Sequence, residues 1–469
     1  MSRRALVAAT SLVVAMLVSS PDALAQASQP NIVYILVDNW GWGDIRIQGG
    51  SVATPRIDAL AEEGLRLTNF NVESQCVPTR SAIMTGRLPI RSGTHRVTYG
   101  QPYGMAPWEY TLPELLSDAG YGTAAFGKWH LGDVEGRLPT NQGFDVWFGI
   151  KNTTDEAGYS STPQFDPEVF PQPYIWQGVR GQPSEKVREL NLESRKTLDR
   201  EIVERSESFI AERADEGVPF FLYTALTQIH PPLGHHPDFD NASRVGIYGD
   251  IIMEVDANVG RVLDALDEAG VSDDTIVILS GDNGAVTDGI GGGSTGPWRG
   301  GFTGYEGGLR TVGMIRWPGH IDAGRVSDAI FASLDWMPTL ANLIGEGERI
   351  PDDRPIDGLN QADFILGRQE SSNREHVLCY IGEDLVSVKW RTFKIHLKTY
   401  ESLWAPLHEY QFPPVYDVKN DPGEANNLMK FNLFSHSWVY GPMGQIIGEK
   451  ARSMVAYPNI KPGQDFDGY

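Results

Sequence analysis

The feature that most constrains this chain is the alternation of short apolar runs with segments of helical periodicity. Four runs are largely apolar, as is typical of strands buried on both faces of a sheet: residues 32–37, 121–126, 219–225 and 275–279. Between the last two runs, residues 251–266 carry apolar side chains at helical spacing. Strands that alternate with helices predict an α/β fold, with a large, mixed, mostly parallel sheet flanked by helices.

Capping residues mark the starts of two further helices. Thr54-Pro55 places a proline in a first helical turn, and Gly64 lies where that helix would end. Thr111 and Glu114 have the spacing of a capping box, which predicts a second helix after Thr111. Both helices lie between predicted strands, as the alternation requires.

The pattern changes near residue 370. Residues 386–390, 393–397 and 415–418 resemble short alternating strands, without the long helices of the earlier part. A chain of 469 residues is long enough for one large and one smaller domain. We therefore predict a large α/β domain over residues 26–370 and a smaller C-terminal α+β domain over residues 371–469.

The amino terminus has the pattern of an export signal. Met1-Ser2-Arg3-Arg4 is basic, residues 5–18 are almost wholly apolar, and Ala23-Leu24-Ala25 resembles a signal-peptidase site. We predict a signal peptide over residues 1–25 and a periplasmic or secreted mature protein. An uncleaved anchor is the alternative, but the apolar run is short for a membrane span, and no later segment resembles one.

Charge and cysteine content exclude some classes of function. Asp and Glu outnumber Lys and Arg by 61 to 39, for a net charge of -22. Phosphate backbones repel such a chain, so we expect no nucleic-acid partner. The two cysteines, Cys76 and Cys379, can form neither a disulfide framework nor a cysteine-rich zinc site.

Two pairs of polar side chains follow predicted strands. Asp38-Asn39 comes directly after the first strand, and Asp282-Asn283 follows the strand at 275–279. The carboxyl ends of parallel strands share one edge of a sheet, so both pairs can converge on one cation. Carboxylate and amide oxygens suit calcium or magnesium. Taken alone, either pair is more typical of an ordinary turn than of a cation site.

Cys76 lies at the predicted start of a helix. Pro78 suits the first turn, Gly86 suits a carboxyl cap, and Arg80 follows Cys76 by about one turn. The residues alone allow two interpretations. One is a buried cysteine beside a surface arginine, and the other is an activated nucleophile at a helix amino terminus.

Three further side chains follow strands. Lys128 and His130 come after the strand at 121–126, and residues two apart in an extended segment face the same side. They could both face an anion. His230 follows the strand at 219–225, although a lone histidine is more often structural.

Several of these residues belong to motifs that occur in a fixed order. Cys76-x-Pro78-x-Arg80 resembles the core of the sulfatase signature, and Gly127-Lys-Trp-His-Leu-Gly132 matches that family's second signature. Other segments resemble the family in the same order: Asn31-Ile-Val, Asn141–Asp145, Gly281–Gly284, Tyr305–Gly308, Arg316–Gly319 and Tyr416–Pro422. Over about residues 30–430 the chain resembles the formylglycine-dependent arylsulfatases, whose fold is alkaline phosphatase-like.

The resemblance implies a chemistry and its cofactors. A formylglycine-generating enzyme would oxidise Cys76 to formylglycine, and one hydroxyl of the hydrated aldehyde would attack the sulfur of a sulfate ester. Elimination then expels sulfate, which avoids hydrolysis of a covalent sulfo-enzyme. The implied cation is calcium, with magnesium as the other option, and its ligands would be Asp38, Asn39, residue 76, Asp282 and Asn283.

The resemblance also assigns roles to cationic and imidazole side chains. Arg80 would stabilise the diolate, and Lys128 would hold the sulfate oxygens. His130 would take the proton in the elimination, and His230 would protonate the leaving oxygen. His95 is expected to line the substrate pocket.

The chain departs from the family pattern in two places. The family usually has two adjacent aspartates after the first strand, whereas here the second is Asn39, which predicts a weaker cation site. A family lysine that contacts sulfate is missing before Tyr305, because no lysine occurs between Lys196 and Lys389. We expect Arg299 to supply that charge and contact the substrate.

The leading interpretation is therefore an exported hydrolase of a sulfate monoester. One alternative is a phosphatase or phosphodiesterase of the same superfamily, and another is an inactive sulfatase-like protein that binds sulfated glycans. The acidic net charge opposes long-range steering of an anionic polymer, and we find no basic cluster that would build a groove for one. This favours a small aryl or sugar sulfate ester.

Overall fold

The structure is a computed structural model that describes residues 29–97, 104–287, 291–402 and 404–469. The predicted signal peptide lies outside these residues. Ten strands form one mixed sheet. In spatial order they are β11 (Arg325–Ser327), β2 (Leu65–Leu67), β10 (Gly313–Arg316), β9 (Thr275–Gly281), β1 (Asn31–Val37), β8 (Phe220–Ala225), β4 (Gly122–Lys128), β5 (Val146–Ile150), β6 (Tyr174–Val179) and β7 (Glu185–Glu189).

The centre of this sheet is parallel, as predicted. Strands β9, β1, β8, β4 and β5 run in one direction, and antiparallel pairing occurs only toward the edges, at β10 and from β5 to β7. The four predicted apolar runs correspond to β1, β4, β8 and β9. Side chains of β1 on both faces are fully buried, which explains why the run is apolar without alternation.

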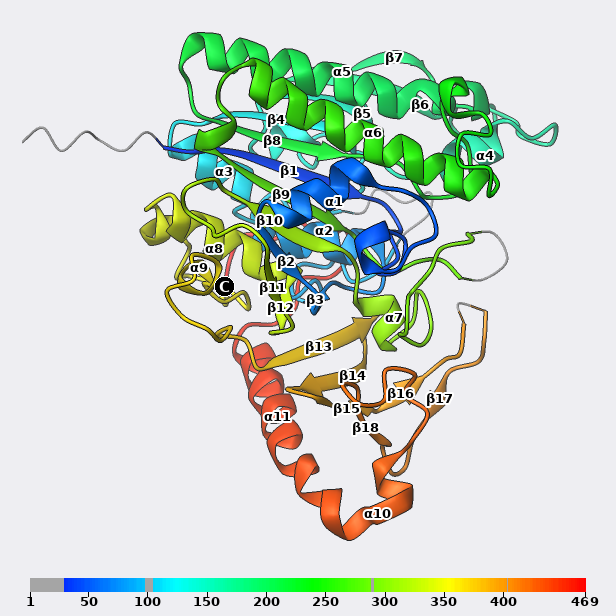
Figure 1. Cartoon of the computed structure of the whole chain (residues 1–469), viewed down its shortest axis with the longest axis vertical. Coiled ribbons are helices and arrows are strands. Elements are labelled where there is room, and N and C mark those ends of the chain that lie inside the picture. The colour runs from blue at the N-terminus through cyan, green and yellow to red at the C-terminus, as the bar shows by residue number, and fades with distance from the viewer. Residues whose placement is uncertain (1–28, 98–103, 288–290, 403) are drawn as a thin grey trace, which may run out of the picture.

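Helices cover both faces of the large sheet (Figure 1). One face packs against α1 (Pro55–Glu62), α5 (Leu192–Glu216) and α6 (Ile247–Glu268). The other packs against α2 (Cys76–Thr85), α3 (Leu112–Asp118), α8 (Trp336–Leu343) and α9 (Ala362–Ile365). The predicted capping box at Thr111 and Glu114 is present at the start of α3. These two cores fix the strand ends that carry the candidate site.

The C-terminal part forms a smaller sheet, also as predicted (Figure 1). The antiparallel strands β13 (His376–Ile381), β14 (Asp384–Trp390), β15 (Phe393–His396) and β18 (Val415–Asp417) pack against α10 (Leu428–His436) and α11 (Tyr440–Ala456). Shorter strands complete the structure: β3 (Phe70–Asn71), β12 (Phe331–Ala332), β16 (Lys398–Thr399) and β17 (His408–Glu409). The domain boundary at residue 370 stays a prediction.

A buried ion network joins the two parts. Glu306, in α7 (Glu306–Leu309), accepts from Lys389 Nζ at 2.7 Å and from Lys394 Nζ at 2.9 Å. Lys394 also lies 3.5 Å from the Glu424 carboxylate. The side chains of all four residues are at most 2% exposed. The small sheet is therefore tied to the large domain through charges that water does not screen.

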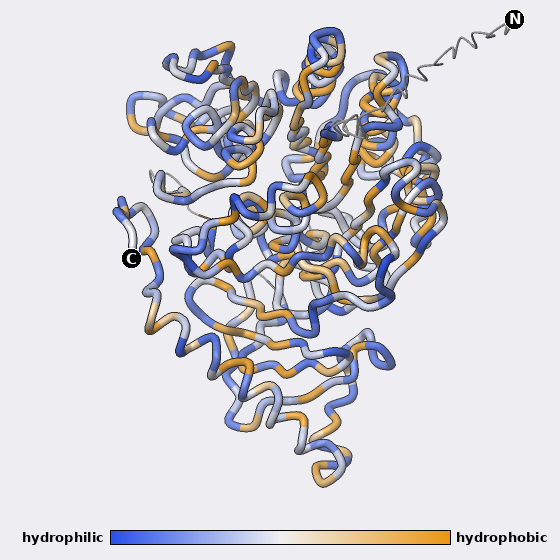
Figure 2. Tube along the Cα trace, turned by 90° about the vertical axis from the view of Figure 1, so that its left-hand side faces the viewer, coloured by the Kyte–Doolittle hydropathy of each residue, from blue (hydrophilic) through white to orange (hydrophobic). Residues whose placement is uncertain are grey.

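Apolar residues gather inside the large domain, and polar ones cover its outside (Figure 2). In the part of the chain that the structure describes, no helix has the length and apolar character needed to span a membrane. The two cysteines, Cys76 and Cys379, are buried and unpaired.

Candidate active site

The two predicted pairs of polar side chains meet at the carboxyl edge of the sheet. Strands β1 and β9 are parallel neighbours, with Val37 opposite Gly281, so the residues that follow them lie side by side. The Asn39 backbone N–H donates to Asp282 Oδ1 at 2.9 Å, and Asn283 Nδ2 donates to Asn39 Oδ1 at 2.7 Å. The pairs thus form one cluster and are not two independent turns.

Unsatisfied polar atoms in this cluster fit a bound cation. Asp38 and Asp282 are fully buried, and two carboxylates this close repel each other. Asn283 Oδ1 is buried and has no hydrogen-bond partner among the described residues. A hard cation would satisfy such an oxygen and offset the carboxylate charges. The donor set is therefore suitable for calcium or magnesium.

Two buried cations also face these carboxylates. Arg80 contacts Asp282 Oδ2 through Nε at 3.1 Å and Nη2 at 2.9 Å, and Lys128 Nζ lies 2.5 Å from Asp38 Oδ2. Burial by itself lowers the pKa of a cation, but the carboxylates prevail and raise the pKa of both Arg80 and Lys128. Both side chains therefore stay charged and provide fixed positive charge in a water-poor site.

Cys76 begins α2 and points at this cluster. Its Sγ lies 3.5 Å from Asp38 Oδ1 and 3.9 Å from Asn39 Oδ1. Burial, followed by the charge of Asp38, raises the pKa of the Cys76 thiol well above its ordinary value. Cys76 is buried, as the first interpretation expects, but Arg80 is fully buried as well and is not a surface arginine. The second interpretation, a nucleophile at a helix amino terminus, stays a prediction.

Lys128 and His130 both reach the site, but not for the predicted reason. Lys128 ends β4, whereas His130 has a φ of 60°, so the segment between them is not extended. The expectation from alternation is therefore wrong, although His130 lies close enough to Lys128, Arg80 and His230 for their charges to affect it. Burial, with a smaller effect of Lys128, lowers the pKa of His130 well below its ordinary value, so the ring is a neutral base.

His230 approaches the cluster from the loop after β8. The closest ligand atoms of Asp38, Cys76 and His230 all lie within 4.8 Å of one another. The His230 ring contacts Thr154 through Nδ1 at 2.9 Å and Thr153 through Nε2 at 3.3 Å. Burial, and then the charge of Lys128, lowers the pKa of His230 to about 3.

No sequence pattern predicted which side chains hold His230. Thr153 and Thr154 come directly before α4 (Asp155–Ser160). In the sequence, threonine at such a position predicts a helix start and nothing more. Arg195 of α5 donates to the His230 carbonyl oxygen at 2.7 Å. It is far from His230 in the chain, and no motif marked it.

The two predicted substrate residues lie in different settings. His95 is 3% exposed, and neither ring nitrogen has a hydrogen-bond partner among the described residues. Arg299 pairs with Glu401 at 2.6 Å and stacks on the Tyr305 ring at 4.2 Å, and no contact is found between it and the cluster around Cys76 in the described chain. Its assignment to the substrate stays a prediction.

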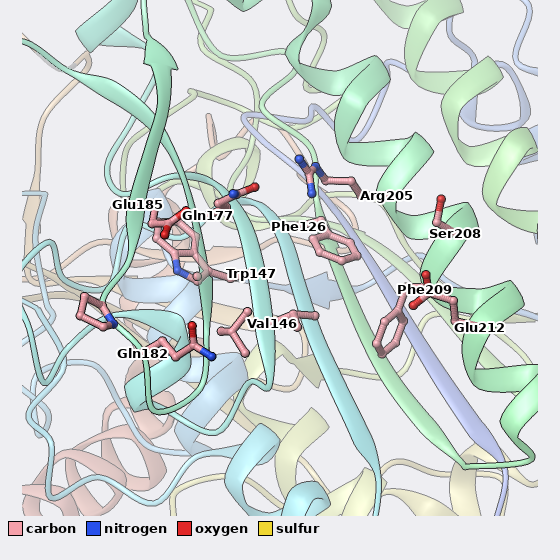
Figure 3. A pocket seen from close by; sticks show the side chains of 13 residues that line it. Phe126, Val146, Trp147, Gln177, Gln182, Glu185, Arg205, Ser208, Phe209 and Glu212 are labelled. Atoms are coloured by element: carbon pink, nitrogen blue, oxygen red, sulfur yellow. The ribbon is translucent and has the colours of Figure 1, made fainter.

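A cavity of about 420 Å³ lies elsewhere, between α5 and strands β4 to β7 (Figure 3). None of the predicted site residues lines it. Its lining combines aromatic and polar side chains from the strands and from α5, including Phe126, Trp147, Gln177, Glu185, Arg205 and Phe209. The strand-end cluster is therefore a separate site.

Comparisons with known proteins agree with the motifs. The family profile described as Sulfatase matches residues 30–346. N-acetylgalactosamine-6-sulfatase from Mus musculus is 32% identical over 93% of this chain and 87% of its own length. Arylsulfatase A from Homo sapiens is 34% identical over 88% of this chain and 86% of its own length. The crystal structure of PsFucS1 sulfatase from Pseudoalteromonas sp. superposes with a TM-score of 0.86 at 31% identity, covering 93% of this chain and 92% of that one.

The family match includes every strand of the large sheet and every residue of the strand-end cluster. The order of the motifs, the fold and the similarities therefore lead to one assignment. This chain belongs to the sulfatase family, and it is a sulfuric ester hydrolase.

Proposed function

We propose that the protein is an exported sulfatase that uses formylglycine made from Cys76 and one bound calcium ion, with magnesium as the other option. The proposal is supported chiefly by the setting of Cys76, a neutral buried thiol beside Asp38 and close to the cations Arg80 and Lys128. A thiol with a raised pKa is a poor nucleophile, so the position needs a different reactive group. The predicted signal peptide supports export.

Each side chain of the site has a role in this proposal. Formylglycine, when present, supplies a hydroxyl that attacks sulfur. Asp38, Asn39, Asp282 and Asn283 would hold the cation. Arg80 and Lys128 stabilise negative charge on the oxygens that surround the reacting sulfur.

The two histidines move protons. His130 is neutral and accepts a proton in the elimination step. His230 is neutral in the free protein, and an anionic ester beside its ring would favour the protonated form. It then donates to the leaving oxygen as the ester bond breaks.

We propose a small aryl or sugar sulfate as the substrate class. Relatives that cover most of this chain include N-acetylgalactosamine-6-sulfatases and arylsulfatase A, which supports both kinds of ester. The net charge of -22 gives no long-range attraction to a highly sulfated polymer.

The test is sulfate release by protein matured with a formylglycine-generating enzyme. Nitrophenyl sulfate and N-acetylgalactosamine 6-sulfate serve as aryl and sugar substrates, with nitrophenyl phosphate and its diester as controls. We expect single-turnover release of inorganic sulfate. Preference for a phosphate ester would favour the phosphatase alternative. Binding of sulfated sugar without release would favour the inactive binding protein.

Asn39→Asp is expected to tighten calcium binding by roughly tenfold, because it adds a negative charge at a ligand position. The measurement is calorimetric titration of calcium into metal-free protein. Asn360→Asp, a change outside the cluster, serves as the matched control for added charge. Equal calcium affinity in the wild type and Asn39→Asp would contradict the assignment of Asn39 as a ligand.

His95→Ala is expected to raise KM for a sulfate ester by roughly tenfold, with kcat little changed. A buried imidazole without a hydrogen-bond partner among the described residues is free to bond the substrate, and one such bond contributes about 1–3 kcal/mol. Burial lowers the pKa of His95, so the neutral ring both donates and accepts. An unchanged KM for both aryl and sugar sulfates would exclude His95 from the substrate pocket.

A further inference from the structure

Thr154 makes two hydrogen bonds that bear on the chemistry of His230. Its Oγ1 lies 2.9 Å from His230 Nδ1 and also 2.9 Å from the Pro231 carbonyl oxygen. The residue is fully buried. The same ring nitrogen lies 2.5 Å from the Pro231 oxygen. Thr154, His230 and Pro231 thus form a closed triangle of contacts around Nδ1.

The side chain of Thr154 does not cap the helix that follows it. Thr154 is the N-cap of α4, where a threonine hydroxyl ordinarily accepts from a backbone N–H of the first turn. Here the side chain makes no capping bond. Its hydroxyl turns to His230 and Pro231 instead, so helix formation alone does not account for it.

The donors and acceptors of the triangle fix the protonation pattern of the ring. A threonine hydroxyl has one proton, and the Pro231 carbonyl can only accept, so the hydroxyl proton goes to that carbonyl. Thr154 Oγ1 must then accept from Nδ1. Both neighbours of Nδ1 are therefore acceptors, and Nδ1 carries the proton in the neutral ring. His230 Nε2 keeps its lone pair, which can accept from the Thr153 hydroxyl, 3.3 Å away, in the free protein.

We propose that Thr154 is a positioning residue that holds His230 as the Nδ1–H tautomer and reserves Nε2 for proton transfer to the ester oxygen. The inference rests on the proposed role of His230 as the acid. In the step, protonated Nε2 gives its proton to the ester oxygen, which keeps the electron pair of the breaking S–O bond. The ring returns to its neutral Nδ1–H form.

The kinetic test compares Thr154→Val, which removes the hydroxyl at similar volume, with Thr154→Ser, which keeps it. The substrates are nitrophenyl, phenyl and methoxyphenyl sulfates, whose leaving groups become progressively poorer. We expect Thr154→Val to lower kcat/KM by about tenfold for the poorest leaving group and by much less for nitrophenyl sulfate, because a good leaving group needs little protonation. Thr154→Ser should keep the wild-type dependence of kcat/KM on the leaving group. An equal loss across the series would overturn the inference.

A second measurement does not depend on turnover. Nitrogen-15 shifts of labelled histidine rings distinguish protonated from unprotonated ring nitrogens, and His230→Gln identifies the His230 signals. We expect Nδ1–H in the wild type and a mixture of tautomers in Thr154→Val. An Nε2–H tautomer in the wild type would overturn the inference. If matured wild type releases no sulfate yet shows Nδ1–H, the proposed function fails while the positioning by Thr154 stands.

Discussion

Cys76→Ala is expected to abolish sulfate release, with a loss of at least about 10³-fold in kcat, because the side chain would carry the reacting hydroxyl. The fold should tolerate the change. Within the described residues, the polar contacts of the thiol are long, at 3.5 Å to Asp38 and 3.9 Å to Asn39, so the free energy of unfolding should fall by about 1 kcal/mol. Turnover and thermal unfolding are measured on the same preparation.

Cys379→Ala is the matched control, because Cys379 is the other cysteine and is also buried. It lies in β13 of the small sheet, and we expect its turnover to stay within about threefold of the wild type. Substantial activity in Cys76→Ala would contradict the assignment of Cys76. Inactivity together with gross unfolding in Cys76→Ala would show that the residue is structural.

Glu306→Ala is expected to lower the free energy of unfolding by about 3–5 kcal/mol, because it leaves Lys389 and Lys394 buried without their shared carboxylate. The measurement is urea unfolding. Glu207→Ala is the control, since Glu207 forms an ion pair with Arg261 in which both side chains are 31% exposed. It should cost no more than about 1 kcal/mol. Equal losses of unfolding free energy in the two variants would contradict the claim that the buried ion network contributes more than the exposed pair.

The same carboxylate makes stability depend on pH. Burial opposes ionisation of Glu306, but Lys389 and Lys394 prevail and hold its pKa well below the ordinary value of 4.5. A carboxyl group whose pKa is lower in the folded than in the unfolded state stabilises the fold fully above its ordinary pKa. This contribution is lost as the pH falls from the ordinary pKa through the folded pKa. Wild-type stability should therefore decline below about pH 4.5. Glu306→Gln should flatten that decline, and an unchanged slope would exclude Glu306 as its source.

Much of the fold could be predicted because burial on both faces leaves a clear mark in the sequence. The strand before Asp38 and the strand before Asp282 are apolar throughout, and their parallel pairing follows from the alternation with helices. Once both strands were placed, the meeting of Asp38 with Asp282 followed from topology. Strand and helix patterns singled out Arg80, Lys128 and His230, but their roles were assigned only through the resemblance to a family.

The rest depended on contacts between distant segments. The turn at His130 is left-handed, which no local pattern predicted for a histidine. Thr154 follows β5 and contacts His230, which follows β8. In the sequence, Thr154 resembles an ordinary helix start, so this contact was not predicted. Glu306 stood in a recognised motif, but its partners Lys389 and Lys394 come from the C-terminal sheet. No local pattern predicted that these side chains would meet.

The most direct test of the account is a peptide mass spectrum across Cys76, taken from protein matured with a formylglycine-generating enzyme and assayed for sulfate release. The account predicts the mass of an aldehyde or its hydrate in place of the thiol, and sulfate release in proportion to the converted fraction. Sulfate release by protein in which Cys76 is wholly unmodified would contradict it, as would full conversion without turnover of any sulfate ester.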